Sequence, residues 1–197
     1  MLNTHNLQRK VDEYRRVLAN TQAYRQTWTD ELAELILSEL GGLIEETGLD
    51  ATLERRGEMA NLEAITLSLG NVRSGMSKEV VQGVKRDLIK HNGSLIYQQL
   101  FNGKVIVMIQ YPTIENYGEQ QAPKTVAIYR PEELRGPYFR RHVEELLTEA
   151  TKWEDYDDDE PHQKIGFKLN FERPDLQAAA VQNEANAGNA GNPGNPA

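Results

Sequence analysis

The pattern of hydrophobic and polar positions makes the first quarter of the chain helical. Residues 3–47 carry apolar side chains at helical spacing in two sets, Leu7, Val11, Tyr14 and Leu18, then Trp28, Leu32, Leu35, Ile36, Leu40, Leu43 and Ile44. The segment 19–27 interrupts this pattern, and Thr27 followed by Asp30 is typical of a helix start. We therefore expect two helices, or one long helix with a bend, with Gly48 as its C-terminal cap.

The first of these two sets is only one residue wide. Its members are spaced by 4, 3 and 4 residues, which is the seam of a coiled coil rather than the wider face of a core helix. A helix with so narrow an apolar edge needs a partner, either the second helix or another subunit. Leu7, Val11, Tyr14 and Leu18 are therefore candidate interaction residues.

After Asp50 the pattern changes to that of strands. Residues 62–69 partly alternate apolar and polar positions, and the runs 95–101 and 104–111 are joined by Asn102-Gly103. Asn and Gly tolerate the positive φ that tight primed hairpin turns require. The run 104–111 is apolar on both faces, so we expect a central, covered strand. Residues 124–131 form a further strand.

Residues 77–93 fit two structures. Five apolar residues lie at helical spacing, with Ser77 as a cap and Asn92-Gly93 as a stop; they are Val80, Val81, Val84, Leu88 and Ile89. The alternative is a strand that ends in an Asn-Gly hairpin. We favour the helix.

A last helix follows Pro131, with Pro137 in its first turn. Its expected buried face consists of Phe139, Val143, Leu146, Leu147 and Ala150. An acidic loop then leads to a strand at 164–171 that has one wet face. From Glu172 the chain lacks the apolar residues needed for order, so we expect a disordered or extended tail.

Together these elements predict an α+β fold. It would consist of an N-terminal helical pair or long bent helix and an antiparallel β-meander covered by helices. The expected organisation is a helical segment at 1–47, an α+β domain at 48–172 and a low-complexity tail at 173–197.

The composition excludes several kinds of functional site. The 197 residues are 39% hydrophobic and 26% charged and include no cysteine, which rules out disulfides, thiolate zinc sites and cysteine nucleophiles. The N-terminus lacks the apolar core of a signal peptide and no apolar run could span a membrane, so we expect a cytoplasmic protein.

The net charge of −8 is concentrated in one place. Six acidic residues between Trp153 and His162 leave the rest of the chain near −2; they are Glu154, Asp155, Asp157, Asp158, Asp159 and Glu160. No basic stripe with interleaved aromatics is present, so sequence-specific binding of nucleic acid is disfavoured. The acidic run also lacks the glycine and the distal glutamate of a calcium loop, so we interpret it as a solvated loop.

No motif predicts catalysis or a cofactor. His142 lies in a segment without the HExxH order of a zinc protease, so we expect a surface histidine. Nucleophile elbows, Walker loops and dinucleotide fingerprints are absent. A carboxylate-dependent metal enzyme is the least favoured of the functional hypotheses.

Basic residues gather where the last helix begins, at Arg130, Arg135, Arg140 and Arg141. The acidic run follows the end of the same helix. Repeated copies of one protein could satisfy this pattern head to tail, and so could contacts within one molecule. We therefore add Arg135, Arg140, Arg141, Asp155, Asp157, Asp158 and Asp159 to the candidate interaction residues.

The segments "ENYGEQQAP" and "RGPYFRRHVEELL" carry a family resemblance. They resemble the closing portion of bacteriophage neck and tail-completion proteins, in which an aromatic-glycine loop follows a strand and a proline-aromatic pair opens the last helix. The resemblance covers about thirty-five residues. It implies a ring around a DNA path, in the virion, where the acidic run would line the lumen as a non-adhesive channel.

These observations favour a non-enzymatic structural subunit of a homo-oligomeric assembly that contacts other assembly proteins, such as a phage neck or tail ring. The alternative is a cytoplasmic adaptor or chaperone that binds a partner through its N-terminal helices.

Overall fold

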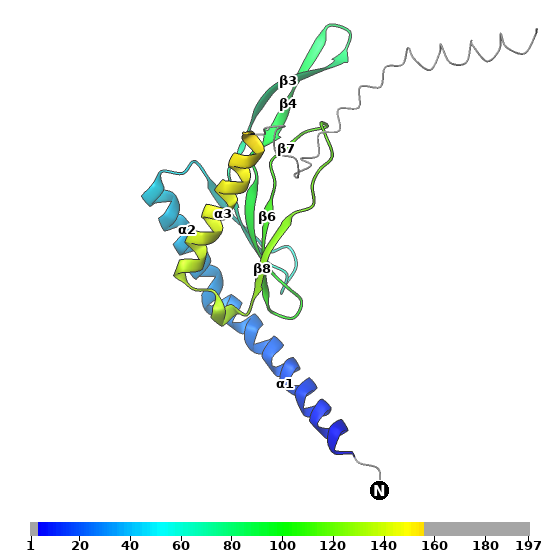
Figure 1. Cartoon of the computed structure of the whole chain (residues 1–197), viewed down its shortest axis with the longest axis vertical. Helices are drawn as coiled ribbons and strands as arrows, with labels where there is room; N and C mark the ends of the chain where they lie inside the picture. Colours follow the sequence, from blue (N-terminus) through cyan, green and yellow to red (C-terminus); the bar gives the residue numbers. More distant parts are fainter. Residues whose placement is uncertain (1–3, 156–197) are drawn as a thin grey trace, which may run out of the picture. The chain divides into compact units, whose positions relative to one another are not determined.

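One continuous helical run opens the chain in the computed structural model, which describes residues 4–155 (Figure 1). It comprises α1 (His5–Thr27), a π-helical segment η1 (Trp28–Leu32) and α2 (Ala33–Thr47). The expected helix start at Thr27 is wrong, because Thr27 has helical φ and ψ and its hydroxyl donates to the carbonyl of Ala23 (3.1 Å) instead of capping. The single long helix is therefore the alternative that is observed.

The end of α2 is as expected. Gly48 has a φ of +67°, and its N–H donates to the carbonyl of Ile44 at 2.9 Å. This left-handed residue is the usual helix C-terminal cap.

Five strands form an antiparallel sheet in the order β1-β2-β5-β6-β8. The strands are β1 (Thr52–Arg56), β2 (Ala64–Ser68), β5 (Ser94–Gln99), β6 (Val105–Gln110) and β8 (Lys124–Tyr129). The four expected strands are confirmed, with β6 in the interior of the sheet. Strand β1 was not expected, because its sequence "TLERR" has no apolar alternation.

A second, three-stranded sheet contains β3 (Asn71–Val81), β4 (Val84–His91) and β7 (Thr113–Ile114). The helix expected at 77–93 is therefore wrong, and the alternative is correct only in its extended structure: the segment contains the end of β3 and all of β4, and Asn92-Gly93 links β4 to β5 of the other sheet instead of closing a hairpin. Val81 pairs with Val84 across a turn in which Gly83 has a φ of +82°. Glycine and β-branched valine both have low helix propensity. The sequence around this turn therefore favours a hairpin over the helix that the spacing of the apolar residues also allows.

The β3–β4 hairpin continues a ribbon that begins in the larger sheet. Strand β2 leads into β3 through Gly70, and β4 leads into β5 through Asn92-Gly93. Two backbone hydrogen bonds keep the strands together at this point, from Asn92 N–H to Gly70 and from Leu69 N–H to Gly93 (3.0 and 3.1 Å). Figure 1 shows the hairpin as a two-stranded arm that extends beyond the five-stranded sheet.

The expected hairpin at Asn102-Gly103 is confirmed, but its turn is not a primed one. Only Gly103 has positive φ (+77°), and its N–H donates to the carbonyl of Leu100 at 2.8 Å. This is the pattern of an ordinary turn followed by a left-handed bulge residue.

Helix α3 (Gly136–Glu154) follows the short 3₁₀ turn η2 (Pro131–Glu133) and has Pro137 in its first turn, as expected. Helices α2 and α3 bury one face of the sheet, where Trp28, Tyr97 and Phe139 are among the largest enclosed side chains. Leu147, expected on the buried face of α3, is 37% exposed.

The helices cover only one face of β6. Val105, Val107 and Ile109 are fully buried, whereas Ile106 and Met108, which point to the opposite face, are half-buried. The expectation of a covered strand thus holds for one face.

Two predicted features lie outside the described residues. They are the strand at 164–171 and the tail from 172 onward; the described residues, 4–155, belong to one compact unit. Within residues 4–155, no helix has the length and apolar character to cross a membrane.

Candidate functional site

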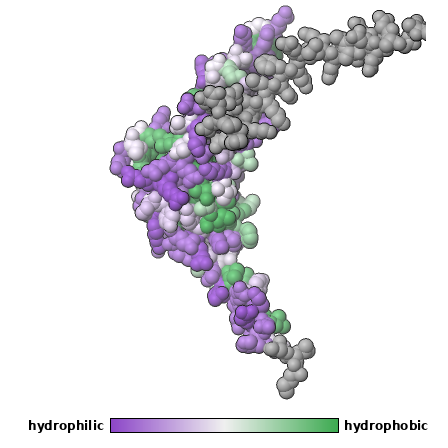
Figure 2. All heavy atoms as spheres, in the orientation of Figure 1, coloured by the Kyte–Doolittle hydropathy of each residue, from purple (hydrophilic) through white to green (hydrophobic). Residues whose placement is uncertain are grey.

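The exposed apolar side chains of α1 are the main candidate interaction site. We call Leu7, Val11, Tyr14, Val17 and Leu18 the helix stripe; Val11 is half-buried and the other four are exposed. Leu7 and Tyr14 are 65% and 64% exposed, and α1 has no buried residue. Figure 2 shows hydrophobic residues scattered along this otherwise hydrophilic helix. Val17 is an addition to the residues expected from sequence, since only the four-residue seam was singled out there.

Three members of the helix stripe lie on the side of the helix that enters the core, and Val11 and Leu18 lie about a quarter of a turn from it. Leu7, Tyr14 and Val17 precede the buried Trp28 by 21, 14 and 11 residues. These intervals are close to whole helical turns of 3.6 residues, so the side chains share one side with Trp28. The face that packs in the core at Trp28 therefore continues along α1 as exposed apolar surface.

The β5–β6 turn holds α1 where it leaves the domain. A Cβ atom on Gly103 would lie 2.7 Å from Tyr24 Cβ and 2.8 Å from the carbonyl oxygen of Thr21. Arg25 Nη2 also donates to the carbonyl of Phe101 at 2.6 Å. The glycine thus allows a backbone-to-backbone contact that fixes the direction of residues 5–20.

The exposed half of α1 is basic overall. It carries four basic residues and two acidic ones, namely Arg9, Lys10, Arg15, Arg16, Asp12 and Glu13. Two exposed ion pairs form within it, Lys10 with Glu13 at 2.8 Å and Arg15 with Asp12 at 3.4 Å. Such pairs add little stability, but the net charge affects which surfaces the helix can approach.

The projecting β3–β4 arm is a second exposed apolar element. Val80, Val81 and Val84 surround its turn and are all exposed. Its strands carry more basic than acidic residues, with Arg73 near Asp87 and Arg86 bound to Glu115 at 2.9 Å. The arm therefore offers an apolar tip on a basic stem.

The charged candidates lie at the two ends of α3. Arg135, Arg140 and Arg141 are exposed at its start, and Asp155 is exposed at its end. These ends are about 28 Å apart for 19 residues, too far to pair with one another. Glu154 instead binds Lys90 of the same chain. Asp157, Asp158 and Asp159 lie outside the described residues.

His142 is buried, so its expected surface position is wrong. It is 1% exposed, and its two ring nitrogens contact the hydroxyls of Tyr97 (Nδ1, 2.9 Å) and Tyr129 (Nε2, 3.1 Å). A neutral imidazole donates from one nitrogen and accepts at the other, so both tyrosines can be satisfied. Helical spacing alone could not reveal these partners, which lie 45 and 13 residues away.

Burial controls the protonation of this cluster. It lowers the pKa of His142 to about 4 and raises the pKa of Tyr97. Both groups are therefore neutral near pH 7. Nearby, hydrogen bonding to Glu149 and Glu145 (2.8 and 3.0 Å) raises the pKa of Lys124. These contacts link β8 to α3, so the cluster holds the helix on the sheet.

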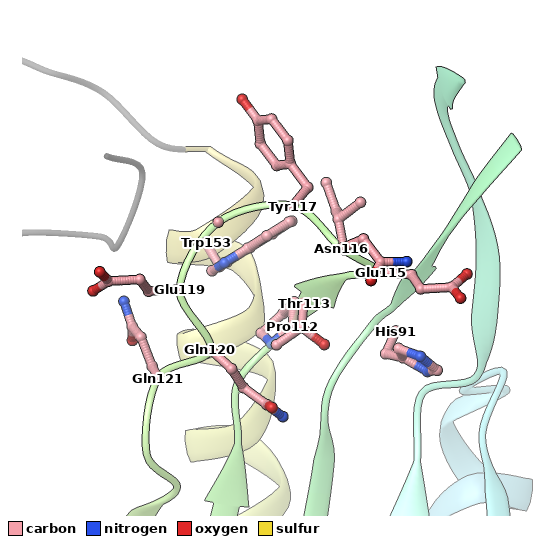
Figure 3. A pocket seen from close by; sticks show the side chains of 12 residues that line it. His91, Pro112, Thr113, Glu115, Asn116, Tyr117, Glu119, Gln120, Gln121 and Trp153 are labelled. Carbon is pink, nitrogen blue, oxygen red and sulfur yellow. The ribbon is translucent and has the colours of Figure 1, made fainter. Parts of the chain in front are cut away.

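A hollow of about 340 Å³ lies between the loop at 112–121, His91 and Trp153 (Figure 3). Of the two glutamates that line it, Glu115 and Glu119, the first is bound to Arg86, and Lys90 lies 5.7 Å from the centre of the Trp153 ring. Among residues 4–155, no group of three histidine, aspartate or glutamate side chains could hold a metal ion. His142 does not line this hollow.

Comparison with protein-family models, with curated proteins and with solved structures gives no match in any of the three. The function of this chain therefore has to be inferred from its own surfaces.

Proposed function

We propose that the protein is a non-enzymatic structural subunit that assembles with further copies of itself through α1. The observation that carries this proposal is the helix stripe, because it exposes several large apolar side chains on a helix with no buried residue. A helix of this kind gains most of its stability from packing. Exposed apolar surface that is continuous with a core face indicates a contact with another protein.

The close contact between Gly103 and α1 supports the same proposal. A flexible terminal helix would lose orientation entropy on binding, whereas α1 is held by the β5–β6 turn and by its continuity with α2. Preorganisation of this kind reduces the cost of association.

A place in a phage neck or tail ring is the more specific form of the proposal. It is supported by the resemblance of residues 115–123 and 135–147 to neck and tail-completion proteins, and by the opposite charges at the ends of α3. In such a ring the acidic run beginning at Glu154 would face the DNA path.

The test is the oligomeric state of the full chain, measured by size-exclusion chromatography with light scattering. We expect the wild-type protein to form oligomers and Tyr14→Asp to be monomeric, because a carboxylate would be buried in the contact. Arg16→Gln is the matched control: it changes the net charge by the same one unit, but Arg16 is exposed and lies two residues from Tyr14, thus on the opposite side of α1. A wild-type protein that stays monomeric at high concentration would contradict the proposal.

An adaptor or chaperone is the second candidate, because the helix stripe would equally fit an apolar groove on a different protein. The same variant separates the two. Loss of partner capture in Tyr14→Asp, with the oligomeric state unchanged, would favour the adaptor.

A further inference from the structure

The five-stranded sheet has a second apolar surface, on the face that α2 and α3 do not cover. We call Ile96, Ile106, Met108 and Ile128 the outer sheet face. Ile96 is paired with Met108, and Ile106 is paired with Ile128. Directly opposed residues of an antiparallel pair share a face, so these four side chains are neighbours. Ile128 is 53% exposed, and the others are half-buried.

This composition is unusual for a sheet face that meets water. Antiparallel sheets with one wet face normally alternate apolar and polar residues along each strand. In β6 the positions opposite the core are Ile106 and Met108, and they are flanked by the uncharged Gln98 and Gln110. Figure 2 shows hydrophobic residues gathered where β6 and β8 lie. The outer sheet face therefore has the composition of a surface that is covered.

The helix stripe of the same molecule cannot cover it. Helix α1 continues through η1 into α2, which packs on the opposite face of the sheet. The helix then passes the β5–β6 turn at Thr21–Arg25 and leads away. Reaching the outer sheet face of its own chain would require the helix to break.

Both surfaces are partly exposed among residues 4–155, and the donating helix is about as long as a strand of the sheet. Residues 5–20 of α1 span about 24 Å, and six-residue strands such as β6 span about 20 Å. An α1–α1 contact would bring two basic segments together, because residues 5–20 carry four basic and two acidic side chains. The outer sheet face and its glutamine neighbours carry no charge, so they impose no such repulsion.

We infer that the helix stripe of one copy packs on the outer sheet face of the next copy. Each molecule then donates one helix and receives one, which is a heterologous contact. Such contacts generate closed rings when the rotation between copies closes, and filaments when it does not. This inference rests on the proposed self-assembly through α1 and identifies the receiving surface.

A complementation experiment tests the inference. Tyr14→Asp alters the donating helix, and Ile128→Asp alters the receiving face. Each variant alone should weaken association at least about 100-fold, because a carboxylate would be buried without a partner. An equimolar mixture should recover a 1:1 dimer by light scattering, since it retains one intact helix and one intact sheet face. Both positions are exposed, so circular dichroism should show that both variants fold.

Cross-linking gives an independent measurement, because the chain has no cysteine of its own. Tyr14→Cys mixed with a differently tagged Ile128→Cys should form a mixed product with a short bismaleimide. Asp12→Cys, on the opposite side of α1 from Tyr14, should not.

Other outcomes separate this inference from the function on which it depends. If Ile128→Asp assembles like the wild type while Tyr14→Asp does not, α1 pairs elsewhere; the inference is then overturned and self-assembly stands. The same holds if Ile128→Cys links to a cysteine placed at Phe167 of its own chain, because a C-terminal segment would then occupy the face. A monomeric wild-type protein overturns both.

Discussion

Replacing Gly103 by alanine tests the contact that directs α1. Gly103 has a φ of +77°, a conformation that costs a non-glycine residue about 1–2 kcal/mol. The new Cβ would also lie 2.7 Å from Tyr24 Cβ and 2.8 Å from the Thr21 carbonyl oxygen. These atoms belong to a helix and cannot rotate away, so turn and helix would have to separate by roughly an ångström, which would weaken packing and the bond from Arg25 to Phe101. We expect a total loss of about 3 kcal/mol or more in the free energy of unfolding.

Gly83→Ala is the matched control. Gly83 has nearly the same φ, +82°, but a Cβ atom there has no neighbour within 4 Å. Its substitution should cost only the backbone strain of about 1–2 kcal/mol. Urea-induced unfolding followed by tryptophan fluorescence measures both variants, in a Tyr14→Asp background so that dissociation does not contribute. Equal losses for the two variants would show that the turn does not hold the helix.

Two further predictions concern the core. Burial lowers the pKa of His142 from 6.5 to about 4, so the unfolded chain binds a proton more tightly than the folded protein does. The free energy of unfolding that depends on neutral His142 is therefore fully present above about pH 6.5. It should decrease by about 3 kcal/mol as the pH falls from 6.5 toward 4. His142→Gln cannot titrate, so its free energy of unfolding should fall less than that of the wild type between pH 7 and pH 4 in urea titrations, and parallel curves would refute this assignment. Phe139→Ala should cost about 3–5 kcal/mol in the same assay because Phe139 is fully buried. Phe101→Ala should change stability by less than about 0.5 kcal/mol because Phe101 is 74% exposed, and similar losses for the two would contradict the described core.

Short sequence motifs correctly predicted the turns and helix ends, because these depend on residues that are adjacent in the sequence. Asn102-Gly103 indicated a hairpin, Gly48 a helix cap and Pro137 a helix start, and each is present. Each signal reflects a backbone preference of the residue itself, which tertiary contacts here do not oppose.

The segment 77–93 shows where such signals fail. Val80, Val81 and Val84 fit helical spacing, but the same residues suit a two-stranded ribbon, and only the pairing of β3 with β4 and the turn at Gly83 select it. Periodicity over a few turns does not separate these alternatives.

The candidate site was predictable in part. The seam at Leu7, Tyr14 and Leu18 was visible in the sequence because it needs only helical spacing. The outer sheet face was not, because Ile96 and Ile128 meet only through the register of β5, β6 and β8. His142 was misplaced for the same reason, since its partners come from other strands.

The π-helical segment at Trp28–Leu32 sets the rotational phase of the long helix. In it the N–H of Ala33 donates to the carbonyl of Trp28, one residue further back than in an α-helix. One extra residue corresponds to a rotation of about 100°. Deleting one residue here would not remove any apolar side chain of α1. It would, however, rotate the helix stripe about the helix axis by more than a quarter of a turn relative to α2. Assembly would then fail because the helix stripe faces the wrong direction, although its hydrophobic side chains are all still present.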